Sequence, residues 1–163
     1  MADIVFSIFE PDAAATARRF DTVPSGCGWI EIRADRLRAD DLPGLIARAP
    51  RRCIVTVRRA AEGGGYEGPE EARIAMLRAA LAAGASVDVE WGSAAAVLAD
   101  ETDPERVILS HHGGVCRIPE MEATYRAMAA SRAARLKIVD SIRHRFLNEL
   151  GVQDVEGRSV FDD

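Results

Sequence analysis

Short apolar segments rich in β-forming residues alternate along the chain with longer segments in which apolar residues recur at helical spacing. Residues 52–58 read RCIVTVR and are strongly β-branched, which is typical of a strand. Residues 69–83 predict a helix that Gly84 ends, with Ile74, Leu77 and Leu81 on one face. The same reasoning predicts strands at 4–9, 29–33, 52–58, 86–91, 106–110 and 135–139, and helices at 11–20, 40–49, 69–83, in an alanine-rich segment ending at 100, at 119–131 and at 141–150.

Strict alternation of six strand–helix units predicts an α/β fold with a parallel sheet and crossover helices. Two architectures fit: a doubly wound open sheet, or a (β/α)₈ barrel of TIM type truncated to about six βα units. No GxGxxG or Walker loop follows the first strand, so the nucleotide-binding form of the open sheet loses support. Neither an internal repeat nor a linker indicates a second domain. We expect one barrel portion over residues 1–151 and a polar C-terminal tail over 152–163.

Polar residues occur in pairs, two positions apart, near the carboxyl ends of the predicted strands. Because side chains alternate across a strand, both members of a pair share one face, while the residue between them is mostly apolar. Buried charge is costly unless it is paired. Such residues either form ion pairs that reach solvent at the strand ends or lie at the mouth of a barrel, where catalytic residues sit, and five pairs in register favour the site. The pairs are Glu31 with Arg33, Thr56 with Arg58, Asp88 with Glu90, Ser110 with His112, and Arg135 with Lys137.

Composition narrows the class of protein. The chain has 163 residues, of which 48% are hydrophobic and 29% charged, with a net charge of −5. The acidic balance argues against nucleic-acid binding. No apolar run is long enough to span a membrane, and the N-terminus does not resemble a signal peptide. Three scattered cysteines favour a reducing, cytoplasmic location over a disulfide framework.

A single lysine, Lys137, stands beside twenty arginines. A lysine held among arginines in a dry pocket has its ammonium form disfavoured, which makes a neutral amine available to attack a carbonyl and form a Schiff base. His112 is suited to move a proton beside such an imine, and Arg33 and Arg58 are suited to bind a carboxylate or hydroxyl groups. A metal site at His111, His112 and Cys116, and a phosphate cradle at Glu62-Gly-Gly-Gly, are both disfavoured.

These residues, in this order, resemble those of type I 3-dehydroquinate dehydratase. The resemblance extends over roughly residues 4–150. Each motif alone is weak evidence, but the motifs together, in this order along the chain, are strong evidence. They are Glu31-Ile-Arg33-Ala-Asp35, Thr56-Val-Arg58 followed by Glu62-Gly63-Gly64, Asp88-Val-Glu90, Ser110-His-His112 and Lys137-Ile138.

The resemblance implies a (β/α)₈ barrel that dehydrates 3-dehydroquinate to 3-dehydroshikimate in the shikimate pathway, without metal or organic cofactor. It implies that Lys137 forms the Schiff base, that His112 is the general base and later the acid, and that Glu62 orients His112. It also implies substrate-binding roles for Glu31, Arg33, Arg58 and Ser7. Structural roles are expected for Asp35, Asp88 and Glu90.

The sequence departs from the family pattern in three places. His111 stands where the family commonly has tyrosine or serine. Gly113 and Gly114 follow the expected catalytic histidine, where the family usually has an acidic or amide residue and then an aromatic one. The expected strands end after the sixth, so the arginine and the lid loop that the family carries on its last two units are missing. Open edges invite pairing with another chain. The alternatives are a fragment of a longer or bifunctional protein, a homodimer, and a homologue that only binds or acts as a scaffold.

Overall fold

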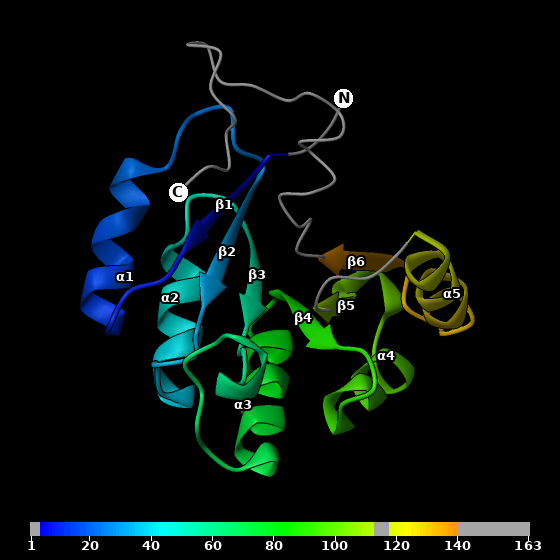
Figure 1. Cartoon of the computed structure of the whole chain (residues 1–163). Helices are drawn as coiled ribbons and strands as arrows, with labels where there is room; N and C mark the ends of the chain where they lie inside the picture. Colours follow the sequence, from blue (N-terminus) through cyan, green and yellow to red (C-terminus); the bar gives the residue numbers. More distant parts are fainter. Residues whose placement is uncertain (1–3, 113–117, 140–163) are drawn as a thin grey trace, which may run out of the picture.

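The computed structural model describes residues 4–112 and 118–139. In those residues the sheet has six parallel strands in sequential order: β1 (Val5–Ile8), β2 (Trp29–Arg33), β3 (Arg52–Thr56), β4 (Ser86–Glu90), β5 (Val107–His112) and β6 (Arg135–Val139). Figure 1 shows this sheet curled into part of a barrel. The strand order never reverses, as it would at the switch point of a doubly wound sheet, and the predicted TIM-barrel type is therefore confirmed.

Helices connect successive strands and pack beside one another: α1 (Ala13–Arg19) against α2 (Leu42–Arg48), and α2 against α3 (Glu70–Ala82). Asp12 begins α1, where its carboxylate accepts a hydrogen bond from the Ala15 amide at 2.7 Å. Pro69 precedes α3, and two glutamates occupy the first turn of that helix. Their negative charge interacts favourably with the positive end of the helix dipole. The α-helices of the described residues are α1 (Ala13–Arg19), α2 (Leu42–Arg48), α3 (Glu70–Ala82), α4 (Leu98–Glu101) and α5 (Ile118–Ala129).

Several predicted bounds shift by one or two residues, as in β3, which ends at Thr56, and two elements differ for reasons that their contacts show. The alanine-rich segment folds as a 3₁₀ turn, η4 (Ala94–Val97), followed by the single-turn α4, because the Ser93 hydroxyl bonds back to the Glu90 carbonyl and starts a tight turn. Strand β5 runs two residues further than predicted, to His112, because β6 pairs with it through that residue. The predicted helix at 141–150 and the tail at 152–163 lie outside the described residues.

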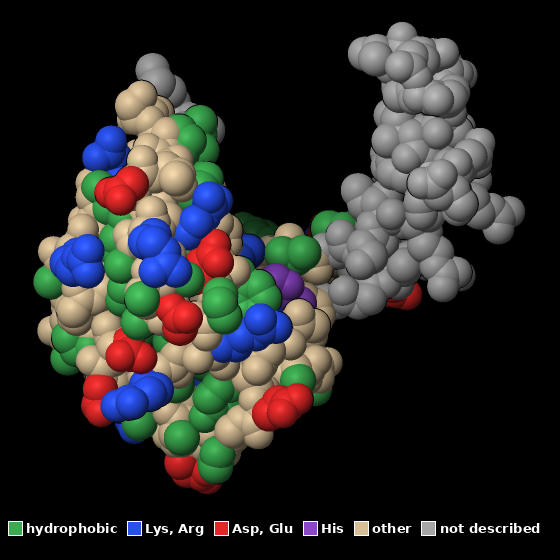
Figure 2. Space-filling view, turned by 90° about the vertical axis from the view of Figure 1, so that its left-hand side faces the viewer, with side chains coloured by type: hydrophobic (Ala, Val, Ile, Leu, Met, Phe, Trp, Pro, Cys, Tyr) green, Lys and Arg blue, Asp and Glu red, His purple; other side chains and the backbone are tan. Residues whose placement is uncertain are grey.

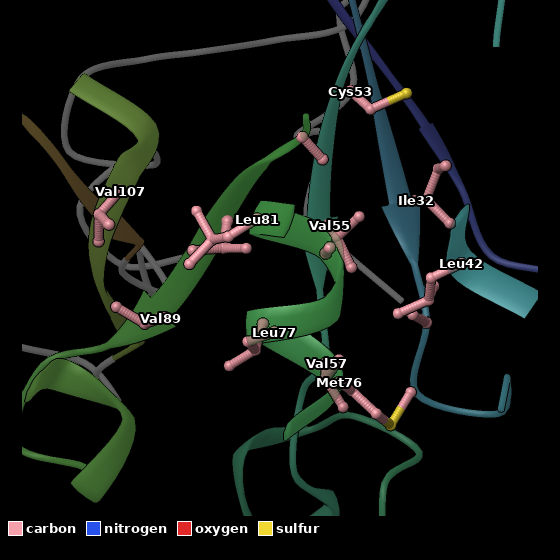
Figure 3. Packing of buried hydrophobic residues seen from close by; sticks show 14 of the residues in the cluster. Ile32, Leu42, Cys53, Val55, Val57, Met76, Leu77, Leu81, Val89 and Val107 are labelled. Atoms are coloured by element: carbon pink, nitrogen blue, oxygen red, sulfur yellow. The ribbon is translucent and has the colours of Figure 1, made fainter. Parts of the chain in front are cut away.

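The core lies between the convex face of the sheet and the helices, as Figure 3 shows for Val55, Val57 and Val89 of the sheet region and Leu77 of α3. These four side chains are fully buried. They occupy the alternate positions that the sequence predicts to be apolar. The opposite face of each strand is therefore free to carry polar groups.

The described sheet ends at β1 and β6, which do not pair with each other. Apolar side chains at these edges are partly open to solvent: Val5 is 46% exposed and Val139 is 40% exposed. On the side shown in Figure 2, acidic and basic side chains are interspersed over the outer surface. No helix of the described residues is long and apolar enough to cross a membrane.

Candidate active site

The concave face of the sheet carries polar side chains on every strand, as the paired positions predict. Most are deeply buried: Thr56 and Ser110 have no exposed surface, and Asp88 is 1% exposed. Buried charge is tolerated only where it is paired and hydrogen-bonded. The contacts of this face therefore decide what the site is able to do.

Lys137 extends from β6 toward Asp88 of β4. Its Nζ donates a hydrogen bond to Asp88 Oδ2 at 3.1 Å. The other oxygen, Oδ1, accepts from the Ser110 hydroxyl at 2.6 Å and from Arg58 Nη2 at 3.1 Å. Asp88 thus holds the lysine and an arginine at once, and it contacts Lys137 directly although the sequence assigned it a structural role.

Glu31 lies on the other side of the lysine. Its Oε1 accepts from the Thr56 hydroxyl at 2.7 Å and lies 3.7 Å from Lys137 Nζ. Its Oε2 accepts from the Ser7 hydroxyl at 2.9 Å. The neighbours of Lys137 are therefore carboxylates, and the expectation of a lysine surrounded by arginines is wrong in this respect. Strand register explains the difference, because Lys137 pairs with Ser110 and faces the acidic positions of β2 and β4.

Arg58 and Arg33 are both engaged by protein carboxylates. Arg58 contacts Asp88, and its Nη1 also lies 3.3 Å from Glu90 Oε1. Arg33 is bound to Asp35 through Nη2 at 2.6 Å, while Asp35 also accepts from the backbone amide of Arg58 at 2.9 Å. Asp35 thereby ties the end of β2 to the loop after β3, the structural role expected of it.

Arg73 of helix α3 is a member of this network that the sequence reasoning missed. Its side chain has no exposed surface. Nη1 donates to Glu90 Oε2 at 2.5 Å and to the Val57 carbonyl at 3.1 Å, and Nη2 donates to Glu70 at 2.8 Å. Its position three, four and seven residues before buried Met76, Leu77 and Ala80 was the available signal.

Glu62 lies in the loop after β3, within the turn η3 (Ala60–Glu62), where Arg59 donates a hydrogen bond to its Oε1. Burial opposes ionisation of this carboxyl, but the hydrogen bond from Arg59 and the charge of Arg58 outweigh it and lower the pKa of Glu62. For Glu90, burial raises the pKa, and the adjacent Glu62 adds to that rise. Among described residues, Glu62 Oε2 is buried without a hydrogen-bond partner.

His112 ends β5 above Ser110 on the same face. Burial, and then the positive charge of Arg58, lower the pKa of His112 below its ordinary value. The ring is therefore a neutral base at neutral pH. Its Nε2 is buried and has no hydrogen-bond partner in the described part of the chain, so this nitrogen is not held by Glu62, the residue expected to orient the ring. The two groups nevertheless interact electrostatically.

An open cavity of about 450 Å³ lies against the concave face. The structure brings Lys137, Glu31 and Ser7 together at this cavity, and it places Arg58, Glu62 and His112 in contact or charge interaction around them. Arg33 does not line this cavity: it is bound to Asp35 and lies 4.8 Å from the centre of the Phe9 ring, while its charge interacts with Glu31 and Asp88. The cavity is lined by Val5, Ser7, Glu31, Ile54, Asp88, Ile108, Arg135, Leu136 and Lys137.

A glycine shapes the loop that carries Glu62. A Cβ on Gly64 would lie 2.1 Å from the Arg58 carbonyl, so only glycine allows the loop to fold this closely over β3. Cys116, Gly113 and Gly114 lie outside the described residues. Among residues that the structure does describe, no group of three histidine, cysteine or acidic side chains could hold a metal ion.

The family model for type I 3-dehydroquinase matches residues 4–144. A curated 3-dehydroquinate dehydratase from Dehalococcoides mccartyi is 34% identical over 90 residues, a stretch that covers 53% of this chain and 40% of the relative. The chain thus spans well under two thirds of that relative's length.

Solved structures agree on the fold. A 3-dehydroquinate dehydratase from Enterococcus faecalis has a TM-score of 0.74 at 23% identity, covering 85% of this chain and 65% of that one. The type I enzyme from Clostridium difficile, solved with covalently modified comenic acid, has a TM-score of 0.71 at 16% identity, covering 96% of this chain and 72% of that one. With the family model matched along most of its length, the chain belongs to the type I 3-dehydroquinase family.

Proposed function

We propose that this chain carries the Schiff-base machinery of a 3-dehydroquinate dehydratase, a hydro-lyase that needs no metal or organic cofactor. The observation that supports this most strongly is the place of Lys137. The only lysine of the chain lines the cavity on the concave face, at the middle of β6. A lone amine at a cavity of a family member is suited to covalent chemistry with a ketone.

In the proposed reaction the neutral amine of Lys137 attacks the ketone carbon of 3-dehydroquinate, and the carbinolamine loses water to give an iminium ion. The proton that Lys137 must first release has a nearby acceptor in Asp88 Oδ2, 3.1 Å away. Removal of a proton from the adjacent carbon gives an enamine, which expels the β-hydroxyl group as water. Hydrolysis then consumes one water and returns the amine, so the net change is loss of one water.

His112 is the proposed base and acid for these two proton transfers. Its lowered pKa keeps the imidazole neutral and able to accept the proton from the carbon beside the imine. The resulting imidazolium then protonates the departing hydroxyl. Glu62 is proposed to hold this imidazolium by charge, since both groups lie near Arg58.

Substrate hydroxyls are proposed to bind at Glu31, Ser7 and Arg58, with Arg33 ordering the outer part of the site. Glu31 already accepts hydrogen bonds from Ser7 and Thr56 and so presents a fixed carboxylate at the cavity. Cytoplasmic location and homodimerisation through the open sheet edges stay predictions.

Borohydride trapping tests the function. The 163-residue chain is incubated with 3-dehydroquinate or 3-dehydroshikimate, reduced and digested, and the adduct is located by mass spectrometry. We expect the added mass on Lys137. Because no other lysine exists, an adduct found only on the α-amine would contradict the assignment.

Variants separate the steps of the reaction. His112→Ala is expected to form the trapped imine while losing turnover, whereas Lys137→Arg is expected to lose both. The open cavity favours a second candidate, a homologue that binds without turnover. Trapping without turnover in the unsubstituted chain would select this second candidate.

A further inference from the structure

A continuous series of ion pairs begins on helix α3, passes to the concave face of the sheet, and reaches Lys137 and then Glu31. Seven side chains take part, and their charges alternate in sign along the series. Each member contacts the next within 3.7 Å. In order, the series is Glu70, Arg73, Glu90, Arg58, Asp88, Lys137 and Glu31.

We infer that Arg73 is a positioning residue for Lys137, acting through Glu90 and Arg58; this inference rests on the nucleophilic role proposed for Lys137. Arg73 touches none of the groups that line the cavity. Its effect must therefore pass through the two side chains between it and Asp88.

The first step is the hold of Arg73 on Glu90. Both side chains are at least 96% buried, and their contact is 2.5 Å. The other oxygen of Glu90 lies 3.3 Å from Arg58 Nη1 without the alignment of a hydrogen bond, and the carboxyl group of Glu62 also acts on Glu90. Arg73 is therefore the stronger cationic partner of this buried carboxylate.

The second step is the division of Arg58 between two carboxylates. Its Nη2 is hydrogen-bonded to Asp88, while Nη1 faces Glu90. As long as Arg73 satisfies Glu90, Arg58 remains on Asp88. Without Arg73, the buried Glu90 carboxylate has Arg58 as its remaining cation and draws it away from Asp88.

The third step connects Asp88 to the reactivity of the lysine. The charged groups that act on Lys137 are Asp88 and Glu31 by contact and His112 by charge; Arg135 lies on its own strand, and Arg58 reaches it through Asp88. When Arg58 leaves Asp88, that carboxylate interacts with Lys137 alone and holds its ammonium form more firmly. Loss of Arg73 should therefore make the free amine available only at higher pH.

The test measures Lys137 reactivity against pH in the full chain, by acetylation with acetic anhydride and by borohydride trapping with 3-dehydroquinate. Since Lys137 is the only lysine, mass spectrometry reads its modification directly, with the α-amine as an internal reference. In Arg73→Met we expect the midpoint of reactivity to rise by about one pH unit, which is roughly a tenfold loss of acetylation rate at neutral pH.

Glu90→Gln should shift the midpoint in the opposite direction. Without the Glu90 charge, Arg58 belongs wholly to Asp88, and Lys137 is released more easily. The double variant Arg73→Met with Glu90→Gln should match Glu90→Gln alone, because Arg73 has no other route to the lysine. Should Arg73→Met fail to fold, the test rests on Glu90→Gln and Arg73→Lys. Arg73→Lys keeps the positive charge and should therefore restore the midpoint of Lys137 reactivity.

Glu70→Gln is the matched control. It removes the outer ion pair of Arg73, at 2.8 Å, and leaves the contact with Glu90 in place. It should lower thermal stability without moving the midpoint of Lys137 reactivity. Equal midpoints for the unsubstituted chain and Arg73→Met, or a Glu70→Gln shift as large as that of Arg73→Met, would overturn the inference. Acetylation needs no substrate, so failure of the proposed function would show separately, as absence of the trapped adduct.

Discussion

Asp88→Asn is the substitution that tests the network most directly, because Asp88 is its central carboxylate. The change keeps the size of the side chain and removes a charge that is 1% exposed. Two cations lose their partner: Arg58, itself 4% exposed, and Lys137, which is 38% exposed. The Ser110 hydroxyl, at 2.6 Å, retains an acceptor in the amide oxygen or in the Val89 carbonyl.

The magnitude follows from the Arg58 pair. At 3.1 Å and an effective dielectric constant near 20, the attraction has an upper bound of roughly 5 kcal/mol. Arg58 keeps Glu90 as a second partner, so we expect the free energy of unfolding to fall by about 3 kcal/mol. The half-exposed Lys137 pair adds only about 0.5 kcal/mol, since solvent screens it. Urea denaturation followed by circular dichroism measures this loss.

Reactivity should move in the opposite sense to stability. With its nearest carboxylate gone, Lys137 should be acetylated faster at neutral pH in Asp88→Asn. The control is Asp40→Asn, the same chemical change at an exposed ion pair with Arg38, which should alter neither quantity. A loss of unfolding free energy smaller than 1 kcal/mol in Asp88→Asn would refute the described pairing, and so would slower acetylation of Lys137.

Three further outcomes are expected. Gly64→Ala should destabilise the loop and reduce borohydride trapping, because the added Cβ would meet the Arg58 carbonyl. Gly44→Ala is the contrasting variant, because Gly44 lies within α2 and an added Cβ there has open space; it should raise the free energy of unfolding, measured by urea titration, by about 0.5–1 kcal/mol. Burial raises the pKa of Cys53 to about 11, so peptide mapping after iodoacetamide treatment at pH 8 should show Cys53 unmodified until the chain unfolds. The pKa of His112 is lower in the folded chain than in the unfolded one, so the unfolded chain takes up the proton first as the pH falls. The free energy of unfolding should therefore decline as the pH falls below 6.5, and it should decline less in His112→Gln.

Period and composition were sufficient to predict the sheet. Alternation of apolar and polar residues placed β2 at Trp29–Arg33 and β6 at Arg135–Val139 with the observed bounds. The same period predicted that one face would be apolar and the other polar. Bounds failed where a local contact decided them, as when Ser93 turned an expected helix into a 3₁₀ turn.

The partners of the charged residues were not predictable in the same way. A pattern places Asp88 and Lys137 on one face, but only the register of β4, β5 and β6 brings their side chains within 3.1 Å. Arg73 illustrates a second limit. Its helical spacing indicates a buried position, but an arginine is buried only when carboxylates from other elements meet it, and Glu90 is one that a linear pattern does not connect to α3.

Carboxylates around Lys137, where arginines were expected, also change how the proposed chemistry would be stabilised. A cluster of arginines would favour the free amine, yet it would equally oppose the iminium ion, which carries the same charge at the same nitrogen. Asp88 and Glu31, at 3.1 and 3.7 Å, delay loss of the first proton but stabilise the cation once the imine has formed. In this arrangement Arg58 sets the balance, because each change in its hold on Asp88 alters the charge that Lys137 meets. In a site of this kind the acidic neighbours stabilise the iminium ion that serves as the electron sink. The site then needs a buried cation such as Arg73 to keep Arg58 in place.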